Sequence, residues 1–186
     1  VGDMVAAFNR HHTAVRAVFV NQWGWDRSAC GQRMDAEMTF ADLRRGTDTE
    51  FGLSVYEPFG ISQLEPLSYG ATCVVSNVCG CVGFARRAAE DLGRPLEPAV
   101  LVGDFTRLDA SESLQELLAM PAERREAVEA AEERRLAGLL AEHLPREAEA
   151  RAQRLEVGHA LAARMSWETV VTGYLLPGLG RAAEPR

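Results

Sequence analysis

The chain has 186 residues, 47% of them hydrophobic, which suits the core of one domain or of a large piece of one. Its 20 basic and 27 acidic side chains leave a net charge of −7, which argues against nucleic acid as the main partner but leaves room for a local basic pocket. No apolar run approaches the ~20 residues that a membrane helix needs, and no signal peptide is visible, so no membrane span is expected.

In chain order, residues 1–10 have the pattern of an amphipathic helix, and residues 14–20 form a short Val-rich run typical of a buried strand. The loop that follows carries Trp23, Trp25 and Arg27. Ligands of an open α/β sheet bind beyond the carboxyl ends of its strands, so Arg27 is a candidate for binding a phosphate and either Trp for stacking on a base or a sugar. The alternative is a surface loop with a structural tryptophan.

Residues 35–47 predict a helix, and residues 51–55 alternate in the manner of a strand. The chain is then expected to turn at Pro58 and Gly60, where a glycine lets the backbone come close to a ligand. The next residues, Ser62-Gln63-Leu64-Glu65, have the sequence of a capping box, which predicts that a helix starts at Ser62.

A strand, a tight turn and a capped helix in this order predict a site for an anion. The amides of Ile61, Ser62 and Gln63 would have no partner inside the helix and would carry the positive end of its dipole. Two carboxylates flank this site, Glu57 at the end of the strand and Glu65 in the first helical turn.

Two further apolar runs, residues 71–76 and 99–102, predict strands, and a short helix is expected over residues 84–92 between them. With the strand over residues 14–20, these runs indicate an α/β fold with a Rossmann-like parallel sheet, followed by C-terminal helices. A complete sheet of this type has about six strands, so the first ones are expected to precede Val1.

The chain changes character near residue 110, where it becomes rich in Ala, Glu, Arg and Leu. Amphipathic helices with charged outer faces are predicted up to residue 164, with breaks at Pro121 and Pro145. Ser166 is expected to cap a last helix. We expect a domain over residues 1–176 and a flexible, Gly- and Pro-rich tail over residues 177–186.

The four cysteines are Cys30, Cys73, Cys79 and Cys81. The spacing of Cys79-Gly80-Cys81 does not suit a zinc knuckle, and no second close pair or His-x-x-x-His completes a set of four ligands. Free thiols in a reducing cytoplasm are therefore expected, and no metal site is predicted.

Two glutamates eight positions apart, Glu57 and Glu65, with Pro and Gly after the first, resemble the donor-sugar site of retaining glycosyltransferases of the two-domain GT-B architecture. The glycogen and starch synthases share this pattern. The likeness continues through residues 66–76, and Ser166-Trp167-Glu168 is similar to the start of the last helix in that family. The loop after residue 76 departs from it, because Cys79-Gly80 stands where relatives usually have Gly-Gly.

The resemblance implies a glycogen synthase-like hexosyltransferase, of which this chain is part of the C-terminal donor-binding domain. Its substrates would be a nucleoside-diphosphate sugar and a glycan or other acceptor, with no metal or other cofactor. It implies Glu57 as the catalytic residue and Gly60, Ile61, Ser62, Gln63, Glu65 and Arg27 as donor-binding residues. The family's N-terminal acceptor domain and its Gly-Arg…Lys phosphate-binding element have no counterpart in this chain, which alone is expected to be inactive. The alternatives are a non-catalytic module that binds a nucleotide sugar or phosphate, and an unrelated doubly wound protein with a chance match.

Overall fold

The computed structural model describes residues 2–13, 37–54, 57–106 and 112–183. The chain divides into two compact units, Val1–Gly46 and Thr47–Arg186, and each is described by itself. The strand predicted over residues 14–20 and the loop with Arg27 lie outside the described residues, so their predictions stay open.

In its described residues, 2–13 and 37–46, the first unit contains the helices α1 (Gly2–His11) and α2 (Phe40–Arg45). The predicted helix over residues 35–47 is thus shorter in its described part, because Thr39 caps it. The hydroxyl of Thr39 accepts a hydrogen bond from the Asp42 amide at 3.3 Å, and the Asp42 carboxylate accepts one from the Thr39 amide at 2.8 Å. These two bonds stop the helix from extending toward the N-terminus.

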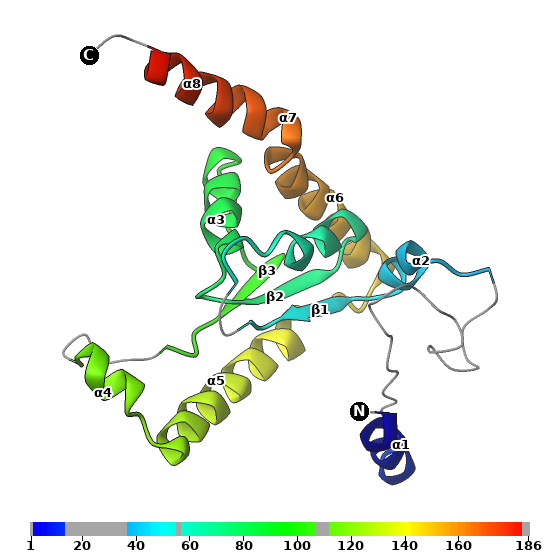
Figure 1. The fold of residues 1–186 in the computed structure, drawn as a ribbon. Helices are drawn as coiled ribbons and strands as arrows, with labels where there is room; N and C mark the ends of the chain where they lie inside the picture. Colours follow the sequence, from blue (N-terminus) through cyan, green and yellow to red (C-terminus); the bar gives the residue numbers. More distant parts are fainter. Residues whose placement is uncertain (1, 14–36, 55–56, 107–111, 184–186) are drawn as a thin grey trace. The chain divides into compact units, whose positions relative to one another are not determined.

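The second unit is built on a parallel sheet of three strands, β1 (Thr49–Gly52), β2 (Thr72–Ser76) and β3 (Val100–Gly103) (Figure 1). Their order in space is β1-β2-β3, so β2 is the central strand, and all of its residues are buried. The strands predicted over residues 71–76 and 99–102 are confirmed to within one residue at each end. The strand predicted over residues 51–55 begins two residues earlier and ends at Gly52, and residue 55 lies outside the described residues. The chain is a mixed α/β protein, and the expected parallel pairing is observed.

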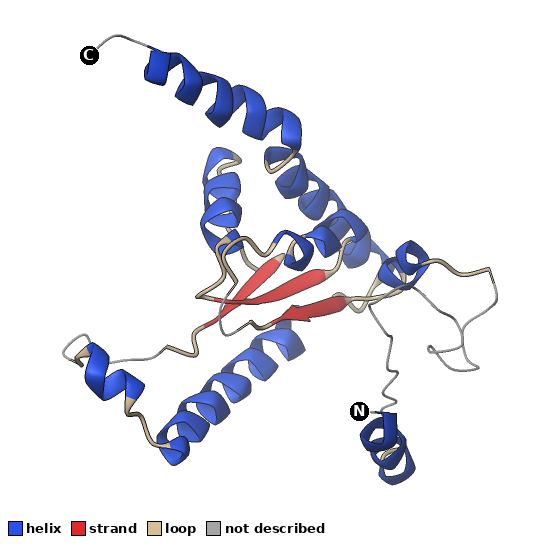
Figure 2. Ribbon diagram, in the orientation of Figure 1, coloured by secondary structure: helices blue, strands red, loops and turns tan. Residues whose placement is uncertain are grey.

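Helices cover both faces of this sheet, as Figure 2 shows. One face carries α3 (Cys81–Asp91), α6 (Ala148–Arg164) and the 3-10 helix η2 (Glu65–Tyr69). The other face carries α5 (Ala122–His143). Successive strand residues point to opposite faces, so Cys73 and Val75 join the first core while Val74 packs with Leu101 and Leu136 in the second.

Helix α6 is fastened to the sheet by a buried arginine. The guanidinium of Arg154 donates to the Thr72 hydroxyl and to the Pro98 carbonyl, each at 2.5 Å, and to the His143 carbonyl at 2.9 Å. Burial lowers the pKa of Arg154. Three acceptors compensate a charge that would otherwise be costly to bury.

The remaining helices are α4 (Leu114–Leu118), α7 (Trp167–Val170), the π-helix η3 (Val171–Leu175) and α8 (Leu176–Ala183). The predicted cap is confirmed, because the Ser166 hydroxyl accepts from the Thr169 amide at 3.3 Å. The expected flexible tail over residues 177–186 is wrong for its first part, since α8 continues to Ala183. Pro177 is the second residue of α8, and α7, η3 and α8 succeed one another without an intervening residue.

Candidate functional site

The candidate site lies where the three parallel strands end, which we call the carboxyl edge of the sheet. Three segments meet there: Glu57–Gln63 after β1, Asn77–Gly80 after β2, and Asp104–Thr106 after β3. Parallel strands bring all their carboxyl ends to one side, which is where ligands bind in open α/β sheets.

Glu57 is fixed beside the end of the central strand. It forms an isolated parallel bridge with Cys79, and its carbonyl accepts a hydrogen bond from the Gly80 amide at 2.9 Å. The sequence predicted that Glu57 emerges at a strand end, and the structure places it one short connection beyond β1. Its backbone is therefore held by the segment that follows β2.

The carboxylate of Glu57 turns back onto the chain that follows it. Its Oε1 accepts from the amide of Phe59 at 3.3 Å and from the amide of Gly60 at 3.1 Å. Two successive amides that point at one anionic oxygen form a small anion-binding turn. The turn therefore does bind an anion in this structure, and that anion is the protein's own carboxylate.

Two glycines allow this turn to pack tightly. Gly60 has φ 65°, in the left-handed region, and a β-carbon there would lie 2.2 Å from the Cys79 Sγ. A β-carbon on Gly80 would lie 1.9 Å from the Pro58 carbonyl oxygen. The close approach predicted at Gly60 is thus present, and its partner in the structure is a cysteine side chain.

The helix after the turn differs from the prediction. The chain forms two 3-10 helices, η1 (Ile61–Gln63) and η2, with Gly60 and Leu64 at their N-caps and no capping side chain at either. The predicted start at Ser62 is therefore wrong, because Ile61 is already helical. The Gln63 amide donates to the Gly60 carbonyl at 3.2 Å, so it is already hydrogen-bonded, and such a short helix has little dipole.

The side chain of Gln63 has a structural role. Its Nε2 donates to the Ser54 hydroxyl at 2.7 Å, and its Oε1 accepts from the Cys79 thiol at 2.6 Å. Gln63 thereby joins β1, the turn and the segment after β2. Of the other predicted donor-binding residues, Ile61, Ser62 and Glu65 are exposed.

Two cysteines lie beneath the turn. Cys79 and Cys81 are 3% and 2% exposed, and their Sγ atoms are 2.9 Å apart. Burial raises the pKa of the Cys81 thiol, and the neighbouring Cys79 raises it further. In the part of the chain that the structure describes, no group of three or more His, Cys, Asp or Glu side chains could hold a metal ion.

A polar cluster at the ends of β2 and β3 was not predicted from the sequence. The Asn77 Nδ2 donates to the Asp104 Oδ1 and to the Thr106 Oγ1, both at 2.7 Å. Among the described residues its buried Oδ1 has no hydrogen-bond partner. The sequence feature that could have predicted this cluster is a polar residue directly after each of these apolar strands. An α/β sheet binds its ligands at that position.

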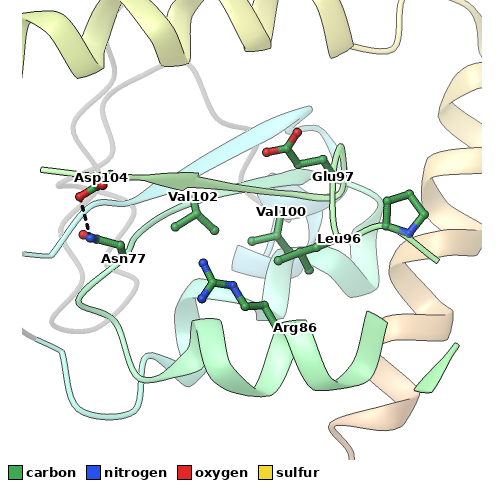
Figure 3. Close-up of a pocket in the computed structure, with 8 residues that line it drawn as sticks. Asn77, Arg86, Leu96, Glu97, Val100, Val102 and Asp104 are labelled. Atoms are coloured by element: carbon green, nitrogen blue, oxygen red, sulfur yellow. Dashed lines mark hydrogen bonds between the residues drawn. The ribbon is translucent and has the colours of Figure 1, made fainter. Parts of the chain in front are cut away.

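This cluster borders a hollow of about 660 Å³ along β3 (Figure 3). Arg86 from α3 points toward the strand, and Glu97 lies at the far end of the hollow. The lining residues are Asn77, Arg86, Pro95, Leu96, Glu97, Val100, Val102 and Asp104.

A buried ion pair supports the cluster from α5. Glu132 is fully buried and accepts from the Asp104 amide at 2.8 Å and from the Arg135 Nε at 2.9 Å. Arg135 also donates to the Val102 carbonyl at 2.6 Å. The hydrogen bond to Glu132 raises the pKa of Arg135, and the pair joins α5 to the end of β3.

No protein-family model, curated protein or solved structure matched this chain in the three comparisons. The helices in the described part of the chain all lack the combination of length and apolarity that crossing a bilayer requires.

Proposed function

We propose that this chain is part of the donor-binding domain of a retaining glycosyltransferase that uses a nucleoside-diphosphate sugar. The observation that carries this proposal is the placement of Glu57, whose backbone is held at the carboxyl edge of a parallel sheet and whose carboxylate sits on an anion-binding turn. The resemblance around Glu57 and Glu65 supports it independently of the geometry.

In this proposal Glu57 exchanges its partners when the donor binds. Its carboxylate rotates away from the amides of Phe59 and Gly60 and accepts a hydrogen bond from a hydroxyl of the donor sugar. Each hydrogen bond to a charged group contributes about 1.5–3 kcal/mol, so the bond to the sugar and the bonds that the two amides make to the diphosphate can together offset the two that are lost. The carboxylate then stabilises the positive charge that develops at the anomeric carbon as the diphosphate leaves.

The diphosphate would bind at the same turn. Once the carboxylate of Glu57 has moved, the amides of Phe59 and Gly60 point at a free site, and the Ile61 amide follows them in the chain. The Gln63 amide is removed from the predicted set because it donates to Gly60. The chain contains no lysine, so any cationic side chain that it supplies to the diphosphate would be an arginine.

Glu65 is proposed to bind the ribose of the donor. It is exposed at the first position of η2, two residues after Gln63. A carboxylate accepts hydrogen bonds from two neighbouring hydroxyls, which is the pattern that a ribose offers. The acceptor, a glycan or a small molecule, would be bound by a separate N-terminal domain, and the reaction needs no metal in this scheme.

Binding of nucleoside diphosphates to this chain tests the proposal. We expect UDP, ADP or GDP to shift the NMR signals of Gly60 and Ile61, and Glu65→Gln to weaken that binding by about tenfold, as loss of one hydrogen bond to a charged group implies. Glu133→Gln on α5 is the matched control, because Glu133 is an exposed carboxylate on the helix that covers the opposite face. Equal weakening by both variants, or no binding by any of the nucleotides, would refute the proposed donor site.

A second candidate is a module that binds a nucleotide sugar without transferring the sugar. The hydrogen bonds from the Phe59 and Gly60 amides to the Glu57 carboxylate favour this candidate, because a carboxylate that keeps these bonds would not contact the donor sugar. An assay of the whole protein that carries this domain discriminates the two candidates. A glycosyltransferase transfers labelled sugar from the donor to an acceptor, whereas a binding module binds the donor without transfer.

A further inference from the structure

We propose that Cys79 and Cys81 form a reversible dithiol–disulfide pair whose oxidation loosens the Glu57–Gln63 turn. Their Sγ atoms are 2.9 Å apart, and one glycine separates the two residues in the chain. A disulfide requires about 2.05 Å between the sulfurs, so a small shift of one side chain closes the bond.

The position of the pair allows oxidation by a small reagent. Both thiols are buried, yet the flanking Val78 and Gly80 are exposed, so the segment lies directly under the surface. A peroxide is small enough to enter after a minor movement of the segment.

The reaction with a peroxide is balanced by the two thiols. The thiolate of Cys79 attacks one peroxide oxygen, the O–O bond breaks, and the leaving hydroxide takes a proton to become water. The sulfur of Cys81 then attacks the sulfenic sulfur of Cys79, and the S–O bond breaks. The proton of the Cys81 thiol leaves with the second water. Two thiols have given two electrons to the peroxide, and a dithiol reductant reverses the change.

Cys79 is the first residue to react in this scheme. Cys79 lies between the exposed Val78 and Gly80, and burial together with the neighbouring Cys79 raises the pKa of the Cys81 thiol. The loop that the disulfide closes contains a single residue, Gly80, so the bond constrains the unfolded chain little and stays easy to reduce.

Oxidation is coupled to the turn through Gln63. In the reduced state the Cys79 thiol donates to the Gln63 Oε1 at 2.6 Å, and Gln63 in turn holds Ser54. A disulfide has no S–H, so this hydrogen bond is lost and η1 is held by fewer contacts through Gln63. The Sγ of Cys79 also packs against Gly60, whose amide donates to the Glu57 carboxylate. The sulfur that would move on oxidation is therefore adjacent to that amide.

Mass spectrometry of the whole chain tests the bond. Trypsin leaves Gly46–Arg86 as one peptide with Cys73, Cys79 and Cys81. After hydrogen peroxide and alkylation, we expect this peptide to carry one alkyl group and to lack two hydrogens, and dithiothreitol should restore three alkylation sites. Cys79→Ser and Cys81→Ser should each abolish the loss of two hydrogens, and Cys73→Ala should retain it. Three alkylated thiols after oxidation, or a loss that persists in Cys79→Ser, would overturn the assignment.

Hydrogen exchange tests the coupling in the same samples. The amides of residues 59–64 should exchange about tenfold faster in the oxidised chain, which is the effect of losing one hydrogen bond, and not in Cys79→Ser treated alike. Unchanged exchange in a chain with the disulfide would overturn the coupling. We also expect oxidation to weaken the affinity for nucleotide, and this expectation rests on the proposed function. If no nucleotide binds in either state, the donor site fails, whereas the disulfide and the exchange are judged by their own measurements.

Discussion

Replacement of Gly60 by alanine tests how tightly the Glu57 turn is packed. Two costs add at this position. An alanine at φ 65° costs about 1–2 kcal/mol, because the left-handed region brings its β-carbon close to the following carbonyl. The β-carbon would also lie 2.2 Å from the Cys79 Sγ and 2.6 Å from the Gln63 Oε1.

Neither contact can be relieved cheaply. Cys79 is buried, and the Gln63 side chain is held by Ser54 and by the thiol. Overpacking of this kind costs about 1–3 kcal/mol, so Gly60→Ala should lower the free energy of unfolding by roughly 2–5 kcal/mol. In a chain of this length each kcal/mol corresponds to a shift in Tm of about 2–4 °C.

Thermal unfolding followed by circular dichroism measures the effect, with Gly83→Ala as the matched control. Gly83 lies in α3 with nothing within 4 Å of an added β-carbon, so alanine there should raise the stability by about 0.5–1 kcal/mol. The double variant Gly60→Ala/Cys79→Ala should lose less stability than the sum of its single variants, because removal of the sulfur relieves the clash. A Gly60→Ala variant as stable as wild type, or costs that simply add, would refute this packing.

Two further predictions concern buried and proposed catalytic carboxylates. Glu57→Gln, in the whole protein that carries this domain, should lower turnover by ~10²-fold or more with nucleotide affinity nearly intact, as loss of one transition-state contact implies; turnover within a few-fold of wild type would exclude a catalytic role. Glu132→Gln should lower the free energy of unfolding in urea by about 2 kcal/mol, because it leaves the partly exposed Arg135 without its anion. The neighbouring exposed Glu133→Gln should change stability by less than about 0.5 kcal/mol, and similar losses in both variants would show that the buried pair contributes little.

The sheet was predictable because its strands carry their own signal. Residues 71–76 form an apolar run between Gly70 and Asn77, and β2 is buried along its whole length at Thr72–Ser76. A strand buried on both faces has to be apolar throughout, so its run is visible without knowledge of its neighbours. The helices over residues 110–164 were predictable for a similar reason, since Pro121 and Pro145 mark their breaks.

The candidate site was predictable only in outline. The alternation over residues 51–55 predicted Glu57 directly at a strand end, but β1 ends at Gly52 and Phe51 is exposed, so Glu57 lies at this edge through its bridge with Cys79. The helix start did not follow, because Ser62 and Glu65 fit a capping box while Gly60, in its left-handed conformation, begins a 3-10 turn one residue earlier. The backbone conformation there depends on Cys79 and Gln63, which pack against Gly60 from other segments.

The sequence by itself determined the three described strands and the helices between residues 110 and 164, and it indicated that Glu57 follows the first of these strands, since these features depend on the periodicity and chemistry of neighbouring residues. Only the tertiary structure decided what those residues contact. It folded the carboxylate of Glu57 onto the amide of Gly60, placed Cys79 against Gln63 and Cys81, and buried Glu132 beside Asp104. Such contacts join residues as far as 28 positions apart, and they arise because parallel strands bring distant segments to one edge of the sheet.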